Sequence, residues 1–192
     1  PWQFSLECKE DDSGWPLSVR THIRALQAGE RPWRPALIGS WFIEPYEPER
    51  QDLFLYGAGH VGRAVVKVLQ DLPFKIYWVD TDRARFPDTV PEDIKILIAV
   101  DPAGITRYAP RGAWHIVMTY SHRIDFNICH EALKMGVSGY IGVIASKTKR
   151  ARFISQLQKS GISASSVRRL VAPIGLPVIE GKEPATIAVS VA

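Results

Sequence analysis

The stretch LFLYGAGHVGRAVV, residues 53–66, constrains the fold of this chain more than any other. A short apolar run typical of a buried strand leads into the glycine pattern GAGHVG, and an amphipathic helix pattern follows it. This order of strand, loop and helix is typical of the first unit of a Rossmann domain. The stretch therefore predicts a loop that binds the phosphate of a dinucleotide or of another small molecule.

Each glycine of this loop has a separate physical task. Gly57 permits the tight turn, Gly59 lets a phosphate approach the backbone, and Gly62 lets the helix pack close to the strand. His60 and Val61 open the helix, where free backbone N–H groups and the helix dipole favour an anion. We predict that these five residues bind the cofactor; the alternative is that the glycines serve chain reversal alone.

Asp80 gives a second signal about the ligand. It ends the next predicted strand, FKIYWVD, roughly 20 residues after the loop, where a carboxylate can accept hydrogen bonds from ribose hydroxyls. We therefore predict Asp80 as a cofactor-binding residue. The alternative is that it only caps the turn DTDRARF.

Strand and helix patterns alternate from residue 51 onward. The alternation predicts an α/β fold, a Rossmann-like doubly wound parallel sheet with helices on both faces. The expected strands are 52–57, 74–80, 94–100, 113–120 and 139–144, and the expected helices are 60–72, 122–136, 146–161 and one starting at Glu183-Pro184. Before this last helix, Pro173 and Pro177 on either side of Gly175 predict an extended loop.

Residues 1–50 have a different character. PLSVRTHIRALQAGE predicts a short helix, LIGSWFIEP a single strand, and EPYEPERQ a linker, because its prolines disfavour helix and sheet. One helix and one strand make a poor core. We therefore expect residues 1–50 to be a remnant of a smaller N-terminal domain and residues 51–192 to be the Rossmann-like domain. Since the chain lacks an initiator Met, we expect a processed chain or a fragment.

Polar side chains follow the carboxyl ends of the predicted strands, where doubly wound sheets bind their ligands. Ser121 and His122 follow the fourth strand, and Lys147 opens the helix after the fifth. We predict all three as cofactor contacts. His122 and Asp125 share a helix face and could form an acid–base pair; alternatively, Asp125 is a first-turn acid that the helix dipole favours.

Composition narrows the function classes. The two cysteines, Cys8 and Cys129, form no CxxC or Cys/His pattern, so we predict no metal site. No apolar run approaches the ~20 residues that span a bilayer, and the N-terminus does not resemble a signal peptide, so we expect no membrane partner and a cytoplasmic location. The net charge of +4, concentrated in SKTKRARF, suits an anionic ligand or partner and does not require nucleic acid.

Four segments together resemble a known protein family. LFLYGAGHVGRAVV, MTYSHRIDF, GYIGVIASKTKRARF and PIGLPVIEGKEPATIAVSVA resemble, in this order and spacing, the C-terminal Rossmann domain of the XdhC/CoxI-type xanthine dehydrogenase accessory proteins. The resemblance covers about residues 51–192. WFIEPYEPERQ is similar to the family's interdomain linker, so residues 1–50 would be a partial N-terminal XdhC/CoxI-type segment and linker.

The resemblance implies a chaperone for the molybdenum cofactor, molybdopterin, rather than a catalyst. Such a protein binds the cofactor, supports its sulfuration with a cysteine desulfurase and helps insert it into a xanthine dehydrogenase-type apoenzyme. A homodimer is left open. The chain has Tyr120-Ser121-His122 where family members often have HSH, and it largely lacks the Gly/Cys-rich segment that many members carry.

Two other functions stay as alternatives. The first is an NAD(P)-dependent oxidoreductase that uses the GxGxxG loop, with Asp80 favouring NAD because its charge repels the 2′-phosphate of NADP. The lack of an obvious substrate domain and of a clear catalytic group beyond His122 weighs against it. The second is an interaction module whose basic helix and Pro-rich tail form a docking surface.

Overall fold

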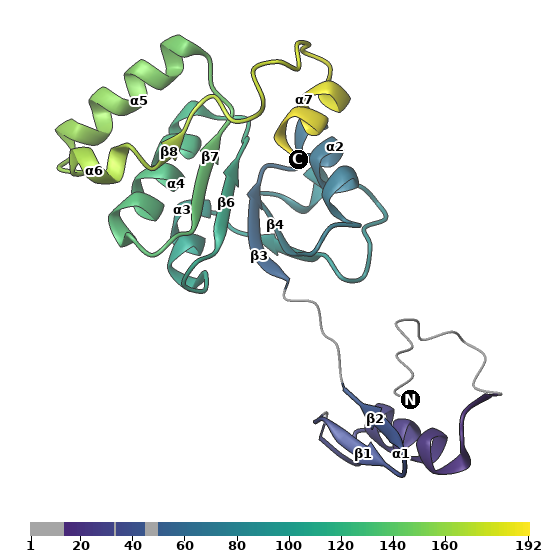
Figure 1. Ribbon diagram of the computed structural model, residues 1–192. Helices are drawn as coiled ribbons and strands as arrows, with labels where there is room; N and C mark the ends of the chain where they lie inside the picture. Colours follow the sequence, from purple (N-terminus) through teal and green to yellow (C-terminus); the bar gives the residue numbers. More distant parts are fainter. Residues whose placement is uncertain (1–13, 33, 45–49) are drawn as a thin grey trace. The chain divides into compact units, whose positions relative to one another are not determined.

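The computed structural model describes residues 14–32, 34–44 and 50–192 (Figure 1). The chain forms two compact units, Pro1–Pro48 and Glu49–Ala192. In the first unit, the predicted helix is present as α1, Leu17–Gln27, which buries Val19 and Leu26 on one face. Gly29, just after the helix, has φ 72°, a left-handed conformation that commonly follows a helix C-terminus.

The prediction of a single strand over 37–45 is wrong. The segment forms two short strands, β1 (Ala36–Ile38) and β2 (Trp41–Ile43), which pair antiparallel. Gly39 between them has φ 63°, so the chain reverses there. Apolar residues continue on both sides of this turn, so the sequence pattern did not predict it. Residues 45–49 of the predicted linker lie outside the described part of the chain.

The second unit contains a six-stranded sheet in which every pair of neighbouring strands is parallel. Its strands are β3 (Gln51–Tyr56), β4 (Phe74–Asp80), β5 (Lys95–Ile98), β6 (Trp114–Val117), β7 (Tyr140–Val143) and β8 (Leu170–Val171). The order across the sheet is β5-β4-β3-β6-β7-β8, so the chain moves outward from β3 and then returns to its other side at β6. This is the order of a doubly wound Rossmann sheet, and the predicted fold class is confirmed.

The sequence predicted five strands and missed β8. This strand pairs only Leu170 and Val171 with β7, and it lies just before the prolines that predict an extended loop. Two residues are too short to produce a strand pattern. Their pairing depends on the edge that β7 offers, which is a tertiary contact.

Helices cover both faces of the sheet (Figure 1). α2 (His60–Leu69) and α7 (Pro184–Val191) lie side by side on one face, although they are distant in sequence. The other face carries the two longer helices α4 (His122–Met135) and α5 (Lys147–Lys159), with the short helices α3 (Pro102–Ile105) and α6 (Ala164–Val167) packed beside them. The remaining helical elements are η2 (Arg83–Arg85) and η3 (Thr106–Tyr108).

The sheet has a hydrophobic core on each of its two faces, and this explains why the central strands are apolar along their whole length. Leu53 and Leu55 of β3 face the α2 side, while Phe54 and Tyr56 face the α4 side. Side chains alternate between the faces of a strand, and here both faces are covered. The central strands are therefore fixed from both sides, and their carboxyl ends present a rigid edge for the loops that follow.

Candidate functional site

β3 and β6 lie at the point where the strand order of the sheet reverses direction. β3 and β6 are adjacent in the sheet, but the chain connects them through β4 and β5 on the far side. Their following loops therefore diverge, and in Rossmann sheets this divergence forms the ligand crevice. The predicted glycine loop and the predicted contact Ser121 both lie at this point.

Two of the three loop glycines are required by the protein's own packing. Gly57 has φ 117°, and a Cβ there would collide with the backbone carbonyl of Met118, which directly follows β6. A Cβ on Gly62 would collide with the carbonyl oxygen of Gly57, which confirms the close approach of α2 to the loop. The indole N–H of Trp78 donates to that same Gly57 oxygen at 3.0 Å and holds the loop against β4.

Gly59 has no such constraint. A Cβ there would meet nothing within 4 Å, and the residue is extended, with φ −75° and ψ −173°, a conformation open to any amino acid. Gly59 is also the N-cap of α2 and provides no side-chain cap. Among the described residues, the amides of Gly59, His60 and Val61 find no hydrogen-bond acceptor. Neither packing nor backbone conformation explains this glycine, but room for a ligand does.

Asp80 serves the loop itself. It is 4% exposed, and its carboxylate accepts hydrogen bonds from the Ala58 amide at 2.6 Å and from the Thr81 amide at 2.6 Å. Arg85 lies 3.4 Å from the same carboxylate. Its oxygens thus accept from the glycine loop and from the turn that follows β4. Asp80 therefore fixes the direction of the Ala58 amide.

Two arginines lie against the loop. The side chain of Arg63 donates to the Ala58 carbonyl at 3.1 Å and also to the Arg85 carbonyl. The Arg85 guanidinium stacks on the exposed Tyr120 ring, 3.8 Å from its centroid, and so bridges the loops after β4 and β6. A small open cavity of about 170 Å³ results, lined by Ala58, Gly59, His60, Arg63 and Arg85. Neither arginine was among the predicted contacts, because nothing in HVGRAVV or DTDRARF indicates which basic side chain turns back to the loop.

The turn after β6 is ordered by a buried carboxylate. Asp125, 1% exposed, accepts from the amide of Thr119 at 2.9 Å and from its hydroxyl at 2.7 Å. Its other oxygen accepts from Lys149 Nζ at 2.6 Å, and Lys149 also donates to the Ile144 carbonyl at 2.9 Å. The acid–base pair considered for His122 and Asp125 is therefore not formed. Asp125 and Lys149 instead fix the backbone that carries Ser121.

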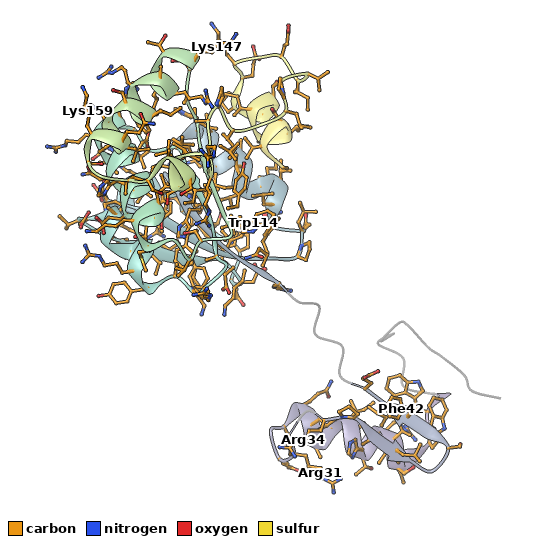
Figure 2. The ribbon with its side chains drawn as sticks, turned by 60° about the vertical axis from the view of Figure 1, so that its left-hand side comes forward. Arg31, Arg34, Phe42, Trp114, Lys147 and Lys159 are labelled. Atoms are coloured by element: carbon orange, nitrogen blue, oxygen red, sulfur yellow. The ribbon has the colours of Figure 1, made fainter. Side chains whose placement is uncertain are left out.

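Two other predicted contacts lie away from the loop cavity. His122 is exposed and lines a groove between α4 and α5, together with Arg123, Phe126, Lys149, Arg152, Phe153 and Gln156. We call this the α4–α5 groove; its volume is about 290 Å³. Lys147 is exposed at one end of α5, with Lys159 at the other (Figure 2). Lys149, two residues further along than Lys147, is the lysine that reaches the sheet edge.

Burial shifts the pKa values of several ionisable side chains in the core of the second unit. Burial lowers the pKa of His115 to about 4, and its Nδ1 lies 3.1 Å from the Tyr56 hydroxyl, whose own pKa burial raises. Burial, and next the charge of Asp125, raise the pKa of Cys129, so this thiol is neutral and inert. The described residues contain no group of three or more His, Cys, Asp or Glu that could hold a metal ion. No helix in the described ranges has the length and apolarity needed to cross a membrane.

Comparison with known proteins identifies the family. Residues 53–192 match the family model described as the XdhC Rossmann domain. The chain belongs to the XdhC family. The match begins in β3 and includes the glycine loop, the turn after β6, α5 and α7 of the XdhC domain.

Two similar proteins place the XdhC domain among its relatives. The uncharacterized protein YqeB of Escherichia coli (strain K12) is 28% identical over 143 residues, which are 74% of this chain and 26% of YqeB. A crystal structure described as a xanthine dehydrogenase from Bacillus halodurans has a TM-score of 0.61 at 18% identity, covering 92% of this chain and 63% of that one. This second similarity shows the fold. The chain thus spans about a quarter of YqeB and less than two thirds of the solved relative.

Proposed function

We propose that this chain binds the molybdenum cofactor in its molybdopterin form, supports its sulfuration and assists its insertion into a xanthine dehydrogenase-type apoenzyme. A cysteine desulfurase would supply the sulfur. Membership of the XdhC family supports this role. In this proposal the cofactor is cargo, and the chain binds, orients and releases it in the cytoplasm without turning over a substrate of its own.

The observation that carries the proposal is the open N-terminus of α2. The amides of Gly59, His60 and Val61 find no acceptor within the described part of the chain, and the missing side chain of Gly59 leaves space in front of them. A phosphate monoester would complete these donors and benefit from the helix dipole. Arg63 and Arg85 line the same cavity and add positive charge. Gly57 and Gly62 keep the loop in the required shape.

The amides that bind the phosphate differ from those at the start of the loop. The Gly57 amide already donates to the Val79 carbonyl at 2.8 Å, and the Ala58 amide donates to Asp80. Binding therefore falls to the residues from Gly59 onward. In this arrangement Asp80 acts on the ligand through the loop.

The rest of the cofactor would extend along the carboxyl edge of the sheet toward Ser121. Ser121 lies in the turn that Asp125 holds, and His122 and Lys147 open the two helices beyond it. We propose that these three residues contact or orient the part of the cofactor that bears the metal. The chain offers the metal no thiolate from Cys129, which is fully buried. The residues described thus fit the phosphate end of the cofactor.

The alternative function, an NAD(P)-dependent oxidoreductase, keeps the glycine loop as its main support. The engagement of Asp80 by Ala58, Thr81 and Arg85 weakens it, because much of the acceptor capacity that an adenosine ribose would use is taken within the protein. Arg85 also offsets the charge that favours NAD over NADP. We expect neither nucleotide to bind as tightly as the molybdopterin-form cofactor.

Isothermal titration calorimetry with the cofactor, NADH and NADPH tests the proposal, and Gly59→Ser sharpens it. Serine suits an N-cap, so the helix is preserved, but its hydroxyl would occupy the amides that the phosphate needs. We expect affinity for the cofactor to fall about tenfold or more, equivalent to about 1.4 kcal/mol. Gly14→Ser is the matched control, since a Cβ at Gly14 also meets nothing within 4 Å.

Two results would count against the proposal. The first is that the wild-type chain shows no saturable binding of the cofactor. The second is tighter binding of NADH or NADPH than of the cofactor, which would favour the oxidoreductase instead.

A further inference from the structure

We propose that the α4–α5 groove is a docking site for an acidic segment of a partner protein. The groove lies between two helices on one side of the sheet, and the loop cavity has a different set of lining residues. The inference therefore stands apart from phosphate binding at the glycine loop, whereas His122 lines the groove and is also proposed to contact the cofactor beyond its phosphate.

The first observation is uncompensated positive charge. α5 carries five Lys or Arg residues in its 13 positions and no Asp or Glu. Lys149 is neutralised by Asp125, but within the described ranges Arg123, Lys147, Arg150 and Arg152 form no ion pair. Cations in the first turns of a helix are also opposed by its dipole. An anionic partner would relieve both effects.

The acidic residues nearby cannot supply that compensation. On α4, Asp125 is buried beneath the groove and engaged by Lys149 and Thr119. Glu131, further along α4, pairs with Arg107 at 3.0 Å and with His130 at 3.4 Å. The arginines at the groove, Arg123 and Arg152, therefore face solvent with their donors free for carboxylates.

The second observation is an aromatic floor. Phe126 and Phe153 meet edge to face, with ring centroids 5.5 Å apart and ring planes at 86°. Both line the groove, with the arginines beside them. A volume of about 290 Å³ accommodates one large apolar side chain. The groove thus combines an apolar anchor point with a cationic border, the usual anatomy of a protein-binding surface.

The shape of the charged area favours a protein segment over other anions. The charge continues past the groove along α5, which is about 20 Å long, whereas a small anion would need only the groove. Single-stranded nucleic acid requires exposed rings on which bases stack. Phe153 is only 4% exposed and is packed against Phe126, so it offers no such ring face.

Fluorescence anisotropy of the full chain with a labelled peptide of repeated Glu-Glu-Leu units tests this inference. We expect saturable binding that weakens as salt is raised, because exposed charges are screened. The double variant Arg123→Glu/Arg152→Glu should weaken binding about tenfold or more. The charge-matched control, Lys67→Glu/Arg168→Glu, alters exposed residues of α2 and of the end of α6 and should leave binding within about twofold.

Three outcomes would overturn the docking site: no binding of the acidic peptide, equal losses in the two double variants, or tighter binding of a short oligothymidylate than of the peptide. Gly59→Ser, which should weaken cofactor binding, should leave peptide binding unchanged, since Gly59 does not line the groove. Failure here would therefore be distinguishable from failure of the cofactor proposal.

Discussion

The carboxylate of Asp125 accepts a 2.6 Å hydrogen bond from the ammonium of Lys149, and this buried ion pair joins the turn after β6 to the first turn of α5. The two side chains are 2% and 11% exposed. Removing one member of such a pair leaves an uncompensated charge in the interior, which costs far more than losing a surface pair. The relationship therefore has a measurable consequence for stability.

Lys149→Ala should lower the free energy of unfolding by about 3–5 kcal/mol, as seen when a buried ion pair loses one partner. Urea denaturation followed by circular dichroism measures this change. Lys147→Ala is the matched control on the same helix, because Lys147 is exposed and should change stability by no more than about 0.5 kcal/mol. Similar small losses for both variants would show that the Asp125 pair has little energetic weight.

Serine should lower the free energy of unfolding at Gly62 but not at Gly59. Gly62→Ser brings a Cβ into collision with the Gly57 carbonyl and should cost about 1–3 kcal/mol. Gly59→Ser meets no neighbour and should stay within about 0.5 kcal/mol of the wild type. Urea titrations of the two variants test this contrast. The prediction is wrong if Gly59→Ser lowers the free energy of unfolding more than Gly62→Ser does.

His115 should make stability depend on pH. Its folded-state pKa is lowered to about 4 by burial, against about 6.5 for an unperturbed histidine, so the unfolded chain binds more protons between these limits. Its contribution is fully present above about pH 6.5 and is lost as pH falls toward 4. The full loss is on the order of 3 kcal/mol.

His115→Gln should flatten this dependence, since glutamine does not titrate. The measurement is the difference in unfolding free energy between wild type and variant at several pH values from neutral down to about 4.5. Taking the difference removes the contribution of other titrating groups. Parallel curves for the two proteins would mean that His115 has the same pKa in the folded and the unfolded chain, which contradicts the prediction.

Cys129 should be unreactive while the chain is folded. It is fully buried in α4, and burial raises the pKa of its thiol, so both access and the thiolate form are lacking. In a Cys8→Ser background, Cys129 is the sole thiol. Ellman's reagent should label it only after denaturant is added, at the rate of unfolding. Rapid labelling of the folded protein would contradict the buried position.

The fold and the candidate site were predictable to different degrees. Alternating strand and helix patterns were sufficient for the doubly wound sheet, because strands covered on both faces must be continuously apolar. The glycine loop was predictable because the left-handed turn at Gly57 and the close approach of Gly62 to Gly57 are both requirements within the GxGxxG pattern itself. β8 and the β1–β2 turn were not, since two paired residues and one left-handed glycine give no periodic signal.

The site differs from the sequence prediction at side chains that could reach more than one hydrogen-bonding or charged partner. Asp80 and Arg85 turn toward the loop, and Lys149 rather than Lys147 reaches Asp125. Spacing along the chain cannot distinguish two lysines two residues apart, because which of them reaches a buried carboxylate depends on the rotation of α5 against the sheet.

The sequence by itself determined the order of the elements, the parallel sheet and the position of the glycine loop, since these follow from apolar periodicity and from the turn and close approach that the GxGxxG spacing requires. Only the tertiary structure decided which amides of that turn remain free, which acids are already paired and where α5 leaves its positive charge. Those outcomes depend on contacts between segments distant in sequence, whose desolvation and hydrogen bonding are fixed only when the two faces of the sheet are packed.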